Sequence, residues 1–149
     1  MKEQIAIKDN KCITDSIVTL LLILILLSLC VFNAIRNIHG ISMEIVYIGF
    51  SLVLIFWFIK ELKTLIMQIK MPNELISIDN EHLYIYTDKE NILSINDVIE
   101  VKKGVVIKKL LANEASLIIN TENDSYKVIY IKDIEKVIET LSVHLKVGE

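Results

Sequence analysis

The chain has 149 residues, of which 53% are hydrophobic, and its four Gly and one Pro are too few for a fibrous or low-complexity protein. Its mean hydropathy of +0.51 is too high for a disordered chain. Residues 72–149 hold nine Lys and fourteen Asp or Glu, a net charge of −5 that repels phosphate and argues against nucleic acid as a partner.

The first apolar segment follows a short charged tail, residues 1–15. Residues 17–32 carry no charge and include thirteen Leu, Ile, Val or Phe, and Asp15 and Ser16 are good amino-terminal caps for a helix over 16–34. At about 1.5 Å per residue, that helix matches the ~30 Å hydrocarbon core of a bilayer. The segment therefore predicts a first transmembrane helix.

A second apolar segment, residues 41–59, predicts a second transmembrane helix after a short external loop, residues 35–40. Three Lys precede the first span and three follow the second, whereas the loop holds only Arg36. Because Lys and Arg accumulate on the cytoplasmic side, both termini are expected in the cytoplasm. Phe32–Ala34 lacks the small-x-small pattern of a signal-peptide cleavage site. We therefore expect a multi-pass membrane protein.

Residues 60–71 continue the helical period beyond the second span and predict a juxtamembrane helical stalk. Pro72 should end this helix, because proline disfavours helical geometry in the residue before it. The apolar stripe of the stalk is free to pack on its own domain, on a second copy or on the lipid surface. It consists of Leu62, Leu65, Ile66 and Ile69.

Residues 72–149 show short β-type runs separated by turn residues, and then an amphipathic helix. Seven strands are expected, at residues 75–78, 83–86, 92–95, 98–102, 105–109, 117–120 and 126–131. Asp133 is a fair cap for a closing helix. The apolar stripe of that helix is Ile134, Val137, Ile138, Leu141 and Leu145. The expected fold is a membrane α-helical hairpin followed by a cytoplasmic α+β domain with a seven-stranded antiparallel sheet.

Two segments, ELISIDNEHLYIYTDKENILSINDVIEVKK and SLIINTENDSYKVIYIKDIEKVIETL, resemble the bacterial pleckstrin-homology (PH) domain. The resemblance rests on a paired opening hairpin, on the spacing of Ile95, Asp97, Val98 and Val101, and on a late strand that runs into a helix. It covers about half of the chain. It implies a PH-like barrel closed by the carboxyl-terminal helix and tethered to a membrane, and it implies no shared enzymatic activity.

No catalytic, cofactor-binding or metal-binding residues are expected. His39, His82 and His144 are far apart in the chain, Cys12 and Cys30 lie in the tail and the first span, and the four glycines are isolated. An enzyme is therefore not expected.

Two features are candidates for binding. Tyr84 and Tyr86 share one face of a strand and would form an aromatic contact patch if outward-facing, or part of the core if inward-facing. The second is the basic cluster of the acidic domain: Lys102, Lys103, Lys108 and Lys109. Gly104 allows a bulge or turn that would bring these lysines to one edge, where they would contact anionic lipid or simply keep an edge strand soluble.

With the bacterial origin that the resemblance implies, we expect a multi-pass, non-catalytic protein of the bacterial cytoplasmic membrane whose PH-like domain is a protein-interaction or membrane-surface module. The alternative is an immunity protein that protects its host against a membrane-active, bacteriocin-type peptide. The expected partners are the lipid bilayer and an unidentified protein, with a second copy of the chain as one candidate.

Overall fold

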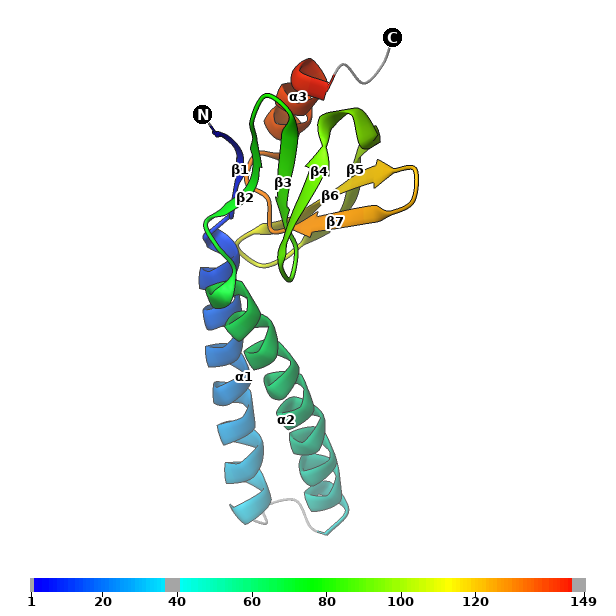
Figure 1. Cartoon of the computed structure of the whole chain (residues 1–149). Helices are drawn as coiled ribbons and strands as arrows, with labels where there is room; N and C mark the ends of the chain where they lie inside the picture. The colour runs from blue at the N-terminus through cyan, green and yellow to red at the C-terminus, as the bar shows by residue number, and fades with distance from the viewer. Residues whose placement is uncertain (1, 37–40, 146–149) are drawn as a thin grey trace. The chain divides into compact units, whose positions relative to one another are not determined.

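The computed structural model describes residues 2–36 and 41–145, which divide into two compact units (Figure 1). One unit is a helical hairpin that begins at Ile13 and ends at Lys70. The other, called the β domain below, combines residues 2–12 with residues 71–145. The β domain is therefore discontinuous in sequence, because the helical hairpin interrupts it.

Helix α1 (Lys11–Arg36) contains the first expected span but begins five residues before position 16. Asp9 accounts for this start, because its Oδ1 accepts the Lys11 amide N–H at 3.0 Å and its carbonyl accepts the Cys12 amide N–H at 3.1 Å. The prediction that Asp15 and Ser16 cap the helix is wrong, since both lie inside it and are buried.

Helix α2 (Ile41–Lys70) is one helix of 30 residues, so the second span and the stalk are a single element. It ends before Pro72, as expected. Within the stalk, Leu62, Ile66 and Ile69 are exposed. The part of the expected external loop from 37 to 40 lies outside the described residues.

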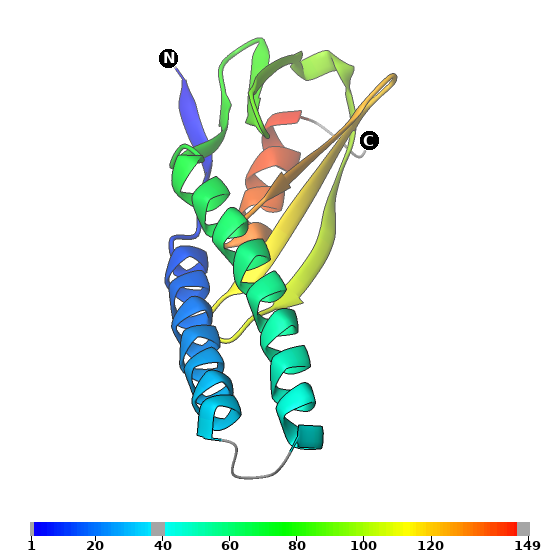
Figure 2. The same cartoon turned by 90° about the horizontal axis from the view of Figure 1, so that it is seen from below.

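The two helices lie side by side in both views (Figures 1 and 2). They pack through a small apolar cluster of Ile23, Cys30 and Leu54. Both helices are long and apolar enough to cross a membrane, and most of their apolar side chains are exposed. Exposed apolar surface of this extent is unfavourable in water and suits a lipid environment.

Strand β1 (Glu3–Ile7) lies in the segment expected to be a charged tail. It pairs antiparallel with β2 (Glu74–Ile78), with Gln4 opposite Ser77 and Ala6 opposite Ile76. Ala6 is completely buried. This strand was not predicted from the sequence, because five residues give little local signal and the partner strand lies far along the chain.

The first sheet has the order β1-β2-β3-β4, with β3 at His82–Tyr86 and β4 at Glu90–Ser94. All of its neighbours are antiparallel. The runs expected at 75–78, 83–86 and 92–95 are therefore confirmed as strands, with ends shifted by one or two residues.

The second sheet has the order β5-β6-β7 and comprises β5 (Val98–Lys108), β6 (Asn113–Thr121) and β7 (Ser125–Ile129). Strand β5 joins two runs that were expected to be separate. Its pairing with β6 shifts register between Lys103 and Val106, so Gly104 marks an irregularity within one strand rather than a turn. A Cβ at Gly104 would lie 2.5 Å from Ser116 Oγ, which explains why glycine occupies the position.

Helix α3 (Ile134–Leu145) presents its expected apolar stripe to the core, with Ile134, Val137, Leu141 and Leu145 buried. It packs on β1, β5 and β6. Asp133 precedes it with a left-handed φ of 52°, and its carbonyl accepts the Val137 amide N–H at 3.2 Å.

The two sheets share one core and are joined beside β1 by a bridge between Lys8 and Ile131. The Lys132 amide N–H also donates to the Ile7 carbonyl at 3.0 Å. Among the described residues, β4 and β5 are linked by a short 3₁₀ helix, Ile95–Asp97, and by no strand pairing. Seven antiparallel strands in two sheets plus a closing helix are thus present in the described chain, while a closed barrel is not confirmed.

Candidate functional site

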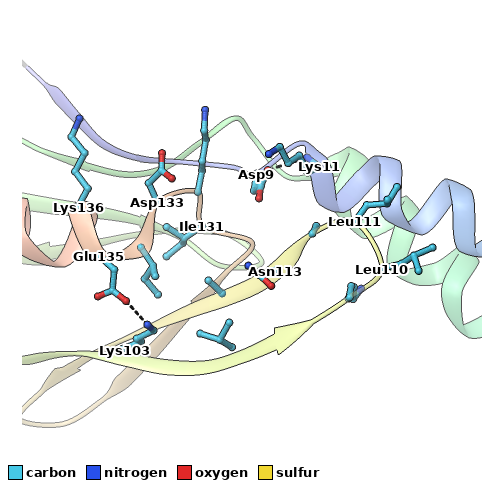
Figure 3. A pocket seen from close by; sticks show the side chains of 16 residues that line it. Asp9, Lys11, Lys103, Leu110, Leu111, Asn113, Ile131, Asp133, Glu135 and Lys136 are labelled. Atoms are coloured by element: carbon cyan, nitrogen blue, oxygen red, sulfur yellow. Dashed lines mark hydrogen bonds and ion pairs between the residues drawn. The ribbon is translucent and has the colours of Figure 1, made fainter.

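An open pocket of about 840 Å³ lies in the β domain (Figure 3). Its walls come from the end of β1 and the start of α1, from the β5–β6 hairpin, and from the segment that leads into α3. These segments are distant in sequence, and a bridge between Lys8 and Ile131 joins two of them.

The lining carries more positive than negative charge, with five lysines against three acids. The lysines are Lys11, Lys103, Lys109, Lys132 and Lys136, and the acids are Asp9, Asp133 and Glu135. Lys103 forms an ion pair with Glu135 across the pocket, as Figure 3 shows. By contrast, Lys11, Lys132 and Lys136 are exposed and make no ion pair within the described chain. The pocket can therefore accept an anionic group, although the surrounding domain is acidic.

Three of the four lysines of the predicted basic cluster pair with acids. Lys102 Nζ donates to Glu100 Oε2 at 2.9 Å, and Lys109 Nζ lies 3.2 Å from Glu114 Oε2. The pKa of the Glu100 carboxyl is lowered, first by its bond from Lys102 and then by one from Asn120. Lys103 pairs with α3, so of the four only Lys108 has no acidic partner among the residues described.

Tyr84 and Tyr86 share the face of β3 opposite the buried Leu83 and Ile85, and both are half-buried. Lys2 Nζ lies 3.3 Å from the centre of the Tyr84 ring, a cation–π contact. Tyr86 packs against the main core. Tyr84 therefore makes a surface contact, whereas Tyr86 contributes to core packing.

Asp79 organises the turn between β2 and β3. Its Oδ1 accepts the amide N–H groups of Glu81 and His82 at 2.9 and 2.7 Å, and its Oδ2 accepts the Tyr84 hydroxyl at 2.9 Å. These three hydrogen bonds, in that order, lower the pKa of Asp79 from 3.8 to about 2. The same hydroxyl bond raises the pKa of Tyr84.

The histidines lie apart, as their spacing indicates. His82 Nδ1 is 3.6 Å from Asp79, and His144 Nε2 is 3.8 Å from Glu3 on β1. His39 lies outside the described residues. Within the described ranges, no three His, Cys, Asp or Glu side chains gather as a metal site would require.

Lys11, Lys132 and Lys136 were not predicted as site residues, because nothing in the local sequence connects them. Leu110 and Leu111, which line the pocket where β5 turns into β6, were also not predicted. One signal was available for these leucines: they lie in a break between two strands, where Gly, Asn, Asp or Pro is usual.

Comparison with protein-family models, with curated proteins and with solved structures gives no match for this chain.

Proposed function

We propose that this chain is a membrane-anchored, non-catalytic protein whose β domain works at the cytoplasmic surface of a bacterial membrane. Helices α1 and α2 cross the bilayer as a hairpin, and the β domain is a PH-like module held against the leaflet from which they emerge. The proposal assigns no catalytic residue to the chain. A protein partner or a second copy stays a prediction.

The pairing of β1 with β2 is the observation that carries this proposal. Strand β1 precedes α1, strand β2 follows α2, and the two strands are hydrogen-bonded neighbours. Both strands must therefore lie on the same side of any membrane that the helices enter. An even number of crossings satisfies this condition. The distribution of Lys and Arg on the two sides of the spans also favours both termini on the cytoplasmic side.

The same pairing supports retention of α1 in the mature protein. Cleavage after α1 would remove β1 from its sheet and expose the hydrogen-bonding edge of β2. It would also leave the apolar face of α3 without the part of β1 on which it packs.

The PH-like part of the proposal is supported by the arrangement of the sheets. A four-stranded and a three-stranded antiparallel sheet enclose one core, and a carboxyl-terminal helix packs on strands of both. This arrangement agrees with the resemblance of residues 74–103 and 116–141 to the bacterial PH domain.

A reporter that is active only outside the cytoplasm tests the topology. We expect it to be silent when fused after Glu149 and active when inserted near Asn37. A reporter fused before Lys2 should also be silent, because β1 must share a compartment with β2. The opposite pattern, or activity at either terminus, would contradict the proposal.

A further inference from the structure

The turn between β5 and β6, residues 109–112, exposes two large apolar side chains. The turn is closed by a bond from the Lys109 amide N–H to the Ala112 carbonyl at 2.9 Å. Leu110 is 65% exposed and Leu111 is 52% exposed. Leucine contributes no turn-forming hydrogen bond and has no preference for turn backbone geometry, so local folding does not account for this pair.

The apolar surface continues from the turn into the end of β5. Val105, Val106 and Ile107 are all exposed, and they precede Lys108 and Lys109 directly. An exposed apolar tip with lysines behind it combines the two attractions of an anionic lipid interface. Apolar groups enter the acyl boundary, and ammonium groups remain among the headgroups.

The turn is fixed to the residues where the helical hairpin leaves the β domain. Ala112 is buried in a small cluster with Cys12 and Tyr130, and Met71 packs against that cluster. Cys12 is the second residue of α1, and Met71 directly follows α2. In Figure 3, Lys11, Leu110 and Leu111 lie at one end of the pocket and Lys136 lies at the other.

The chain length from these residues to the apolar spans is short. Ser16 Oγ donates to Glu61 Oε1 at 2.7 Å, so the start of the first span and the residues just beyond the second lie at one level of the helical hairpin. Five residues separate Lys11 from Ser16, about 8 Å of helix. The headgroup layer of one leaflet is roughly 5–8 Å thick, so the start of α1 lies at its outer boundary if α1 spans the bilayer.

We propose that the β5–β6 turn inserts Leu110 and Leu111 into the leaflet from which α1 emerges, with Lys108 in contact with anionic headgroups. This inference rests on the proposed membrane anchorage and adds a third attachment point to the two helices. It also explains why Lys108 has no acidic partner in the described structure, whereas Lys102, Lys103 and Lys109 do.

The test measures the depth of spin labels on the full chain in lipid nanodiscs. Labels are attached separately to Leu110→Cys and Leu111→Cys variants, and each variant keeps the other leucine. Native Cys12 and Cys30 are buried, and unsubstituted protein measures their background labelling. At both positions we expect collisions with apolar oxygen to exceed those with a water-soluble nickel chelate in discs containing anionic lipid. Adding Lys108→Gln should shift the balance towards the chelate.

Two further labelled variants make the outcome decisive. Asn123→Cys, in the exposed turn between β6 and β7, should favour the nickel chelate. Leu52→Cys, on the 64% exposed apolar surface of α2, should favour oxygen. Water-like signals at 110 and 111 with a lipid-like signal at 52 would overturn the insertion alone. A water-like signal at 52 would overturn the membrane anchorage itself.

A second copy of the chain is the competing occupant of the turn. If two copies met through this turn, labels at 110 would broaden one another, and dilution with unlabelled protein would remove the broadening. That result would overturn the lipid contact. A spectrum unchanged by dilution, together with preference for oxygen, supports it.

Discussion

At the scale of single residues, a few polar side chains fix the local geometry of the β domain. Asp79 holds the β2–β3 turn with one oxygen on two backbone amides and the other on Tyr84. Tyr84 in turn lies beneath Lys2, whose Nζ is 3.7 Å from Glu90 Oε1 on β4. These contacts connect the residue before β1 to the opposite edge of the first sheet.

Asp79 gives a prediction with a defined pH dependence. Its folded pKa of about 2 lies below the ordinary 3.8, so its ionised form stabilises the fold above the ordinary value, and this contribution is lost as the pH falls through 2. Asp79→Asn should therefore lower the melting temperature of the full chain at pH 7, and the difference from the native chain should shrink towards pH 2. Thermal melts of detergent-solubilised protein across this range measure it.

Asp88 provides the control for this prediction, because it is an exposed acid in the next turn, between β3 and β4. Asp88→Asn should change the melting temperature little at any pH. An Asp79→Asn difference that stays constant from pH 7 to pH 2 would show that the carboxylate charge is not what holds the turn.

At the scale of elements, the helices and strands that depend on local sequence patterns were predicted from the sequence. The two apolar spans follow from long uncharged runs, whereas five of the strands and the buried stripe of α3 follow from 2- and 3.6-residue periods. The misses depended on distant contacts. Strand β1 needs Ser77, and the continuity of β5 through Gly104 needs the close approach of Ser116.

The candidate site was less predictable than the fold for the same reason. The lysine cluster was predicted from a contiguous run of sequence. Glu135 of α3, which pairs with Lys103, lies 32 positions away and could not be connected with it from the sequence. The pocket takes its lining from segments near both ends of the chain. Of the residues that line the pocket, Lys103 and Lys109 were predicted as binding candidates from the sequence, whereas the leucines of the β5–β6 turn were not.

Helix α3 gives a prediction at this scale. Leu141 is completely buried, whereas Glu139 on the same helix is exposed. Leu141→Asp should remove core packing and bury a charge, at a cost of about 3–5 kcal/mol, and Glu139→Ala should change stability by within about 0.5 kcal/mol. Hydrogen-exchange protection of the β6 amides in the full chain reports the difference. Equal loss in both variants would mean that α3 does not pack on the core.

At the scale of the whole molecule, the helical hairpin is an insertion between two adjacent strands. The Lys8 amide N–H donates to the Asn73 carbonyl at 2.8 Å, and Lys8 Nζ donates to the Met71 carbonyl at the same distance. The two ends of the β domain thus meet where the helices leave it, and a short linker is long enough to join them.

This proximity predicts that the β domain folds without the helices only if β1 is kept. Residues 2–10 joined through a short Gly-rich linker to residues 71–149 should give a folded protein. Residues 72–149 alone, which lack β1 and its buried Ala6, should melt about 10 °C or more below it. Circular dichroism melts of both fragments test this, and equal melting temperatures would show that β1 adds nothing to the fold.

The short connections on both sides of the helical hairpin also have a mechanical consequence. Residues 8–10 join β1 to α1, and residues 71–73 join α2 to β2. Each helix is therefore connected to its own strand by only three residues. Sliding of α1 along α2 is thereby converted into shear between β1 and β2. One residue of strand corresponds to about 3.4 Å, and a slip of that size would turn Ala6 from the core to the outer face. The register of β1 against β2 therefore opposes sliding of α1 along α2.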